Sequence, residues 1–205
     1  MTLPRAASPT ASNRADARPL LVLASQSPRR LNLLAQGGIV PDAVKPADID
    51  ETVKRGEVPR AYVERLAREK ASAAGADNGA IVLAADTTVV CGRRLLHKAE
   101  TADEVRRYLA QLSGRRHQVL TGIAVRLGET IRTRTVMTRV SFARLTPSQI
   151  ESYVQCGEGI GKAGGYAMQG RAETFVKSIN GSYSNVVGLP LYETVTMLRG
   201  LGYPC

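Results

Sequence analysis

One carboxylate stands in an unusual sequence environment, between two apolar runs. Residues 80–90 read AIVLAADTTVV, so Asp86 and Thr87 separate two short stretches that are typical of strands covered on both faces. A carboxylate in such a place must be paired, hydrogen-bonded or bound to a cation to offset its desolvation. Glu51, at the end of the acidic run 48–51, supplies a second carboxylate, and oxygen ligands of this kind suit Mg²⁺ or Mn²⁺. We therefore take Asp86 and Glu51 as candidate metal ligands, with a turn aspartate and a solvated acidic loop as the alternatives.

A second set of polar side chains lies where a short apolar run leads into a helical pattern. Residues 20–24 are apolar, Pro28 suits the first position of a helix, and Ser27 before it is a good N-cap. Backbone N–H groups and the dipole at such a helix start attract anions, and hydroxyl and guanidinium groups add to the attraction. The sequence therefore predicts a phosphate site here, with a capped helix and two solvated arginines as the alternative. The side chains that would form the site are Ser25, Ser27, Arg29 and Arg30.

Three lysines are further candidates, and one of them has an unusual position. The helical pattern of residues 59–76 carries an apolar stripe at i, i+3 and i+4 that ends in Lys70 at i+7. Lys98 and Lys162 have no such positional support, and most lysines are simply exposed. Residues 157–162 (GEGIGK) resemble a phosphate-binding P-loop, but the first glycine stands one position too close and alanine follows the lysine where Ser or Thr is required. We reject the P-loop interpretation.

The apolar pattern around these residues predicts alternating strands and helices in the first half of the chain. The predicted elements are a strand at 20–24, a helix that starts at 28 and ends before 37, a helix at 59–76, two short strands within 80–90, a capped helix at 101–114, a hairpin at 118–143, a capped helix that opens at 146–149, loops and short strands at 157–188, and a helix at 190–201. We expect one compact α/β unit over residues 20–205, preceded by a disordered basic leader at 1–19.

Composition and charge narrow the choice of partners. Of the 205 residues, 43% are hydrophobic and 22% charged, which is the balance of an ordinary soluble globular protein. The formal net charge of +10 favours polyanionic partners such as nucleic acid, an acidic membrane face or the phosphates of a nucleotide. No run approaches the 18 or more apolar residues of a membrane span, and the three cysteines lack metal-type spacing. We expect a cytoplasmic protein with no membrane partner.

Five segments read together resemble the Maf family, the septum-formation-protein-like nucleotide pyrophosphatases. The segments are LASQSPRRLNLL (23–34), RLAREKA (65–71), AADTTVV (84–90), SGRRHQVLTGIAV (113–125), and GKAGGYAMQG with NGSYSNVVGLPL (161–170 and 180–191). The resemblance implies a two-lobed α/β fold around a strongly twisted mixed sheet, with the active cleft between the lobes. It also implies that water, with the help of a divalent metal, attacks the α phosphorus of a nucleoside triphosphate and releases pyrophosphate. A homodimer is a family-level expectation.

The resemblance assigns roles to residues at matching positions. Asp86 matches the proposed proton acceptor of the family. The other charged positions of the family's site match Glu51, Lys70, Lys98 and Lys162. The positions at which the family's branches differ in base preference match Arg29, Thr87 and Gln169.

Short motifs at these positions resemble the dTTP and UTP branch rather than the 7-methyl-GTP branch. Ser-Pro-Arg-Arg at 27–30, Ala-Asp-Thr at 85–87 and Gln-Gly at 169–170 match the former, and the Gln169 amide has both a donor and an acceptor for a pyrimidine edge. The chain departs from the family's usual pattern at 97–99, which reads His-Lys-Ala in place of Lys-Pro, and at Gly161, where an acidic residue often stands.

Two rival functions remain open. The first is a hydrolase of the same fold with broader or 7-methyl-GTP-type specificity. The second is a non-enzymatic division regulator that binds nucleic acid through its basic surface. The second would be expected to show a basic stripe interleaved with stacking aromatics, but only 4% of the residues are aromatic and none is Trp. We therefore expect a nucleoside triphosphate as the partner and no specific nucleic acid.

Overall fold

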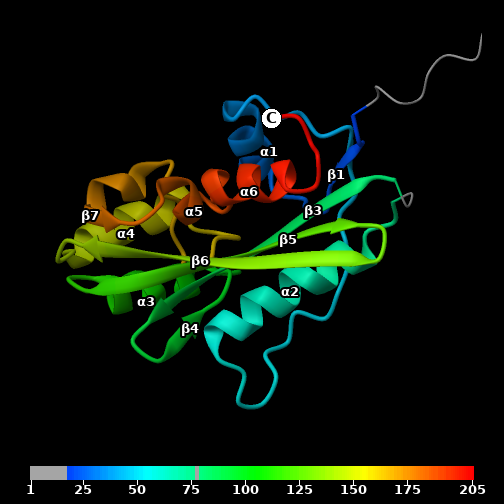
Figure 1. The fold of residues 1–205 in the computed structure, drawn as a ribbon. Helices are drawn as coiled ribbons and strands as arrows, with labels where there is room; N and C mark the ends of the chain where they lie inside the picture. The colour runs from blue at the N-terminus through cyan, green and yellow to red at the C-terminus, as the bar shows by residue number, and fades with distance from the viewer. Residues whose placement is uncertain (1–17, 77–78) are drawn as a thin grey trace, which may run out of the picture.

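A mixed sheet of seven strands forms the centre of the protein in a computed structural model that describes residues 18–76 and 79–205 (Figure 1). The strands are β1 (Leu21–Leu23), β2 (Ala43–Val44), β3 (Ile81–Cys91), β4 (Arg94–Leu96), β5 (Arg116–Leu127), β6 (Thr130–Phe142) and β7 (Val176–Asn180). Their order is β2-β1-β3-β5-β6-β7, and β4 also pairs with β3. β1 is parallel to β2 and to β3, whereas the pairs β3–β4, β3–β5, β5–β6 and β6–β7 are antiparallel. The predicted α/β class with a mixed sheet is confirmed.

Strand β3 joins two lobes, because two short strands share one of its edges. β5 pairs with one edge of β3 along almost its whole length. On the opposite edge, β1 pairs with residues 81–83 and β4 with residues 89–91, so that among the described strands none pairs with residues 84–88 on this side. The interruption between β1 and β4 contains Asp86 and Thr87, and it opens the cleft between the lobes.

The prediction of two short strands within residues 80–90 was wrong. β3 is continuous through Asp86, whose backbone pairs with Gly122 of β5. The carboxylate therefore lies in mid-strand, where it is buried, rather than at the tip of a strand. The polar pair looked like a break in the sequence, but it marks the place where one edge of the strand has no neighbouring strand.

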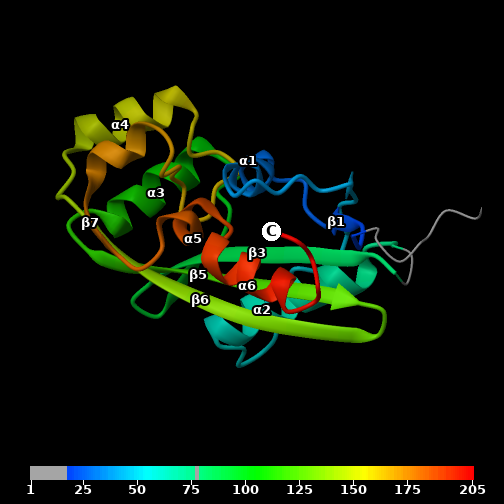
Figure 2. The same cartoon turned by 45° about the horizontal axis from the view of Figure 1, so that its top comes forward.

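The helices cover the two faces of the sheet unequally (Figure 2). They are α1 (Pro28–Gln36), α2 (Pro59–Ala73), α3 (Ala102–Leu112), α4 (Pro147–Cys156), α5 (Tyr183–Val187) and α6 (Leu191–Arg199), with the 3₁₀ turn η1 at Arg171–Phe175. α2 lies beneath the sheet in Figure 1, while α1, α5 and α6 lie above it, and in Figure 2 α6 crosses in front of the strands with α2 behind them. The largest apolar cluster joins α1, α3, α4 and α6 to one face of the twisted sheet, and two smaller clusters lie between α2 and the other face.

Local capping signals account for several helix starts. Thr146 and Gln149 form the reciprocal capping box that opens α4. Thr101 caps the backbone N–H of Glu104 at the start of α3, but the Glu104 carboxylate accepts from the N–H of Glu100 rather than from that of Thr101. α5 was not predicted, because a helix of five residues is too short to show an apolar period.

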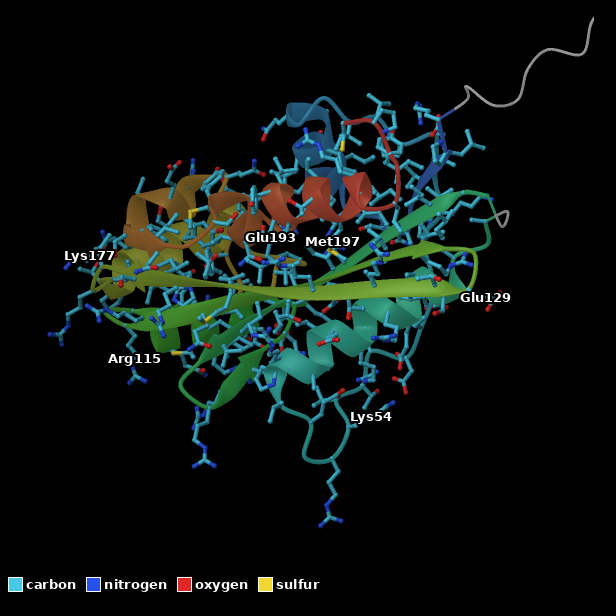
Figure 3. The ribbon with its side chains drawn as sticks, viewed as in Figure 1. Lys54, Arg115, Glu129, Lys177, Glu193 and Met197 are labelled. Carbon is cyan, nitrogen blue, oxygen red and sulfur yellow. The ribbon has the colours of Figure 1, made fainter. Side chains whose placement is uncertain are left out.

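Most of the predicted leader, residues 1–19, lies outside the described residues. Its last two residues are described, and Arg18 makes a 2.8 Å ion pair with Asp42. Within 18–76 and 79–205, the helices are all too short or too polar to cross a lipid bilayer. Cationic side chains such as Lys54, Arg115 and Lys177 are exposed at the margins of the molecule (Figure 3).

Gly122 sets the distance between α2 and the sheet. A Cβ atom at this position would lie 2.2 Å from the carbonyl oxygen of Val63 in α2. We expect Gly122→Ala to lower the free energy of unfolding by about 1–3 kcal/mol, because the helix must shift to accept the methyl group. Urea denaturation measures this change. Gly75→Ala is the matched control, since a Cβ there meets no atom of a described residue within 4 Å. Equal effects of the two substitutions would contradict the close-approach explanation.

Candidate active site

One cleft of about 480 Å³ collects every side chain that the sequence put forward. Those side chains are Ser25, Ser27, Arg29, Arg30, Glu51, Lys70, Asp86, Thr87, Lys98, Lys162 and Gln169. They come from α1 and the turn before it, the loop before α2, α2 itself, β3, and the segments around residues 98 and 161–169. Cations outnumber carboxylates in the lining, so the cleft suits a polyanion.

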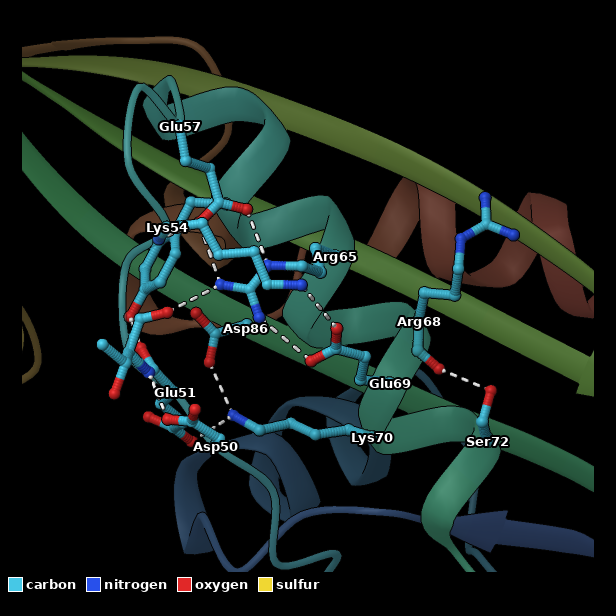
Figure 4. Close-up of polar contacts among 12 residues, drawn as sticks. Asp50, Glu51, Lys54, Glu57, Arg65, Arg68, Glu69, Lys70, Ser72 and Asp86 are labelled. Carbon is cyan, nitrogen blue, oxygen red and sulfur yellow. Dashed lines mark hydrogen bonds and ion pairs between the residues drawn. The ribbon is translucent and has the colours of Figure 1, made fainter.

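An ammonium group bridges the two candidate carboxylates (Figure 4). Lys70 Nζ lies 2.7 Å from Asp86 Oδ1 and 2.6 Å from Glu51 Oε1. Lys98 Nζ lies 3.6 Å from the other oxygen of Glu51, Oε2. Lys70 and Asp86 are buried, whereas the side chains of Glu51 and Lys98 are 41% and 60% exposed. The strong part of this cluster is therefore the buried Lys70–Asp86 pair, since exposed pairs contribute little.

The packing of α2 explains the unusual position of Lys70. Val63, Leu66 and Ala67 of the same helical stripe are fully buried against the sheet. Lys70 continues this stripe directly under β3, and its ammonium meets Asp86 there instead of water. The helical stripe that looked irregular in the sequence therefore places the Lys70 ammonium next to the middle of β3.

Nearby groups hold Glu51 in place and keep it charged. The backbone carbonyl of Glu51 accepts a 2.9 Å hydrogen bond from the Tyr62 hydroxyl. Burial raises the pKa of Glu51, but the hydrogen bond and charge of Lys70, helped by Lys98, outweigh burial, so its pKa is lowered. Burial, together with the charges of Asp86 and Glu51, raises the pKa of Tyr62 to about 12, so this hydroxyl stays protonated.

The two carboxylates fit a divalent cation only in part. Among the described residues, no group of three or more His, Cys, Asp and Glu side chains could hold a metal. Glu51 and Asp86 nevertheless direct oxygens toward one cation, the Lys70 ammonium, and no hydrogen bond or ion pair from a described residue reaches Asp86 Oδ2. Mg²⁺ sites commonly combine one or two carboxylates with substrate phosphates and water. The donor set therefore fits a cation that also binds the substrate.

The turn before α1 forms the opposite wall of the cleft. Ser27 occupies the N-cap position, but its side chain makes no capping hydrogen bond, so the prediction that Ser27 caps the helix was wrong in this respect. Ser25 Oγ instead accepts hydrogen bonds from the backbone N–H of Ser27 (3.2 Å) and from Arg30 Nη1 (2.9 Å). The serines and arginines lie together, as the predicted phosphate site requires.

The two arginines differ in how firmly the protein holds them. Arg30 donates to Ser25 Oγ, to the carbonyl of Gly188 (Nε, 2.9 Å) and to Thr87 Oγ1 (Nη2, 3.4 Å). Burial lowers its pKa, and the negative charge of Asp86 partly offsets this effect. Arg29 makes a single long contact, from Nε to the carbonyl of Val187 (3.4 Å), and no described residue accepts from its terminal nitrogens. Arg29 therefore has donors left for a ligand, while Arg30 is largely fixed by the protein.

Thr87 belongs to the same polar cluster as Arg30. Its hydroxyl lies 2.9 Å from the hydroxyl of Thr121 and 3.3 Å from the carbonyl of Gly188. Neither Thr121 nor its neighbour Asn185 was singled out from the sequence. Both are buried polar residues, and only Thr121 stands in an apolar stretch, a signal that the sequence analysis did not use for it.

The third wall carries Lys98, Lys162 and Gln169. An isolated β-bridge joins Lys98 to Ala163, so the two lysine segments lie side by side. Burial lowers the pKa of Lys162, and the positive charge of Arg29 lowers it further. Gln169 is exposed, and its side chain makes no hydrogen bond to any described residue, which leaves the amide available to a ligand.

Glu158, which the sequence did not point to, positions the segment that contains Gln169. Its Oε2 accepts a 2.8 Å hydrogen bond from the backbone N–H of Arg171. A Cβ atom at Gly170 would lie 2.3 Å from that oxygen, so this position requires glycine or a displaced carboxylate. The glycine-rich run 157–162 thus works as a structural turn whose glutamate is tied to the neighbouring loop.

Comparison with known proteins identifies the family of this chain. A family model described as Maf-like protein matches residues 20–201. A dTTP/UTP pyrophosphatase of Rhodopseudomonas palustris (strain BisB18) is 57% identical over 195 residues, covering 91% of this chain and 94% of the relative. Another, from Hyphomonas neptunium, is 57% identical over 185 residues, covering 89% and 96%. The solved Ham1 protein of Staphylococcus aureus is more distant, with a TM-score of 0.44, 20% identity, and coverage of 60% and 71%. With a family model matched over most of its length and relatives more than half identical, this chain belongs to the Maf-like protein family.

Proposed function

We propose that the protein hydrolyses dTTP and UTP between the α and β phosphates, giving the nucleoside monophosphate and pyrophosphate. One structural observation carries the proposal: a carboxylate cluster faces two arginines across a single cleft in which cations predominate. Relatives more than half identical over about nine tenths of the chain are named dTTP/UTP pyrophosphatases, which supports the same activity. A triphosphate repels anionic nucleophiles, so such a site must neutralise phosphate oxygens and align water with the leaving group.

In this proposal Asp86 accepts the proton of the attacking water. Asp86 lines the cleft, and its Oδ2 has no partner among the described residues. Arg29, Arg30 and Lys162 bind phosphate oxygens, Arg29 through terminal nitrogens with no partner among the described residues and Arg30 from a position that its own hydrogen bonds fix. Ser25 and Ser27 shape the wall beside them. Lys70 holds the carboxylates of Asp86 and Glu51 next to one another, and Lys98 balances the outer oxygen of Glu51.

A divalent cation, Mg²⁺ or Mn²⁺, completes the proposal. Asp86 and Glu51 would hold it, and when bound it would neutralise phosphate charge and make the attacking water more acidic. Because the described residues offer two carboxylates rather than a full ligand set, oxygens of the triphosphate would supply part of the coordination. We further propose that the enzyme acts in the cytoplasm, where its three free cysteines stay reduced. Dimerisation stays a prediction.

The experiment that tests the function measures pyrophosphate release from a panel of nucleotides. The panel contains dTTP, UTP, dCTP, dATP, dGTP and 7-methyl-GTP, with purified protein and Mg²⁺ or Mn²⁺. We expect the highest kcat/KM for dTTP and UTP. A preference for 7-methyl-GTP would move the chain to the other branch. DNA binding without pyrophosphate release from any nucleotide would refute the enzymatic proposal.

Removal of divalent cations is expected to stop turnover. Dialysis against EDTA should reduce pyrophosphate release to background, and titration with Mg²⁺ or Mn²⁺ should restore it. The cation should also bind more tightly in the presence of a non-hydrolysable triphosphate analogue, because the described residues offer no group of three or more His, Cys, Asp and Glu ligands. Calorimetric titration with and without the analogue measures this linkage. Undiminished turnover in EDTA would exclude a metal role for Asp86 and Glu51.

The substitution Gln169→Glu is expected to change base selectivity more than stability. Gln169 is exposed at the cleft, and the change replaces an amide donor with an acceptor that the pyrimidine N3–H and carbonyl pattern tolerates less well. We expect the ratio of kcat/KM for UTP over dGTP to fall about tenfold, the size of one polar contact. Gln155→Glu on α4, outside the cleft lining, is the control. An unchanged ranking of nucleotides would argue against base contact by Gln169.

A further inference from the structure

We infer that Thr121 and Asn185 are positioning residues for the Arg30 guanidinium. They act through a chain of hydrogen bonds that runs from the protein interior to the wall of the cleft. The inference rests on the proposed function, because it assumes that this wall binds phosphates. Neither residue lines the cleft, so neither is expected to touch the substrate. Both are fully buried and lie in sequence segments far from α1.

Asn185 fastens the short helix α5 to the sheet. Its side-chain amide donates to the carbonyl of Val119 on β5 (3.0 Å) and to the hydroxyl of Thr138 on β6 (2.9 Å). Thr138 Oγ1 in turn donates to the carbonyl of Ser182 and accepts from its N–H, both at 3.1 Å, at the start of the same helix. A five-residue helix has little stability of its own, so these contacts fix its place.

The C-terminal end of α5 holds both arginines. The carbonyl of Val187 accepts from Arg29 Nε (3.4 Å), and the carbonyl of Gly188 accepts from Arg30 Nε (2.9 Å). The last carbonyls of a helix carry partial negative charge and have no partner within the helix. They therefore attract guanidinium groups, and any shift of α5 moves the atoms that orient Arg29 and Arg30.

Thr121 provides a second connection between α5 and the arginine. Its hydroxyl donates to the backbone carbonyl of Asn185 (3.3 Å) and lies 2.9 Å from the hydroxyl of Thr87. Thr87 accepts from Arg30 Nη2 at 3.4 Å and lies next to Asp86 on β3. The chain Asn185–Thr121–Thr87–Arg30 thus connects α5, β5, β3 and α1, and it ends beside the candidate base.

This arrangement makes Arg30 a positive charge with a fixed position in the cleft wall. Arg30 is held on three sides, by Ser25, Thr87 and Gly188, so its charge has a fixed position. A preorganised cation binds phosphate charge without first having to be ordered, and small displacements of such groups are costly. Thr121 and Asn185 maintain that position although they make no contact with the ligand.

The substitution Thr121→Val tests the inference. It keeps the shape and β-branching of the side chain but removes the hydroxyl. We expect KM for dTTP and Kd for inorganic tripolyphosphate to rise about tenfold, the effect of one misplaced charged donor. Thr121→Ser, which keeps the hydroxyl, should restore both values. Thr135→Val is the matched control, because its hydroxyl on β6 is buried with no partner among the described residues.

A double-mutant cycle separates positioning from general loosening of the fold. In an Arg30→Lys background, Thr121→Val should change the Kd for tripolyphosphate less than twofold, because the group that it positions is gone. Additive effects, or wild-type KM and Kd in Thr121→Val, would overturn the inference. Should Thr121→Val fail to fold, Thr138→Val removes an acceptor of the Asn185 amide and is judged by the same criteria.

The experiments distinguish a failure of the proposed function from a failure of the positioning inference. If the wild-type protein released no pyrophosphate from dTTP or UTP, the function would fall, but tripolyphosphate binding would still decide the positioning role. A wild-type protein that bound no tripolyphosphate would refute the inference as well.

Discussion

Asp86→Asn is expected to lower kcat for dTTP by about 10²–10⁴-fold, the range for loss of a positioned proton acceptor. The change preserves size and leaves an oxygen that accepts from Lys70, while Glu51 still neutralises that ammonium. The fold should therefore remain intact. Pyrophosphate release measures kcat, and circular dichroism with thermal unfolding checks the fold.

The matched control for this prediction is Asp50→Asn. Asp50 is exposed, accepts from the backbone N–H of Thr52, and adjoins Glu51 without lining the cleft. The substitution Asp50→Asn removes one negative charge from the same region and should change kcat less than about twofold, as expected for a surface substitution. Near-normal turnover of Asp86→Asn in a folded protein would dismiss Asp86 as the proton acceptor.

Two residues of the cleft could be predicted from the local sequence because each violates a local rule, whereas Lys98, Lys162 and Gln169 were assigned by the family resemblance. Asp86 interrupts apolar β sequence, and Lys70 ends an apolar helical stripe. A buried charge needs a partner, so each position indicated that a partner exists. That the two are partners of one another depends on how α2 crosses the sheet. Gly122 permits that close approach, and it looks like any other strand glycine in the sequence.

The parts that the sequence did not predict depend on long-range pairing. Asp86 looked like a break in a strand, because the pattern of one segment does not show that β1 and β4 share an edge of β3. The roles of Thr121 and Asn185 were missed for the same reason: their partners lie on other elements. α5 is held by tertiary hydrogen bonds rather than by its own apolar period. Local patterns identify elements, whereas a site at a strand interruption arises only from their assembly.

The largest expected effect on stability follows from removing the ammonium that joins the two carboxylates. Lys70→Met keeps the length and packing of the side chain but leaves Asp86 buried without its ion-pair partner. Breaking a buried pair on one side costs about 3–5 kcal/mol. Because the charge of Arg30 also acts on Asp86, we expect a loss near the lower limit, about 3 kcal/mol, in urea denaturation. Turnover should fall as well, since Asp86 and Glu51 then repel one another.

Two further variants show whether the unpaired, buried charge of Asp86 causes the loss of stability in Lys70→Met. Lys54→Met removes an exposed lysine whose contact with Glu69 is 3.8 Å long, and it should change stability by less than about 0.5 kcal/mol. The double variant Lys70→Met/Asp86→Asn should be more stable than Lys70→Met alone, because an amide is less costly to bury than an unpaired carboxylate. A double variant no more stable than the single one would mean that Lys70 acts through packing rather than charge. In that case the buried ion pair would be a consequence of how α2 lies on the sheet and not what holds Asp86 in the cleft.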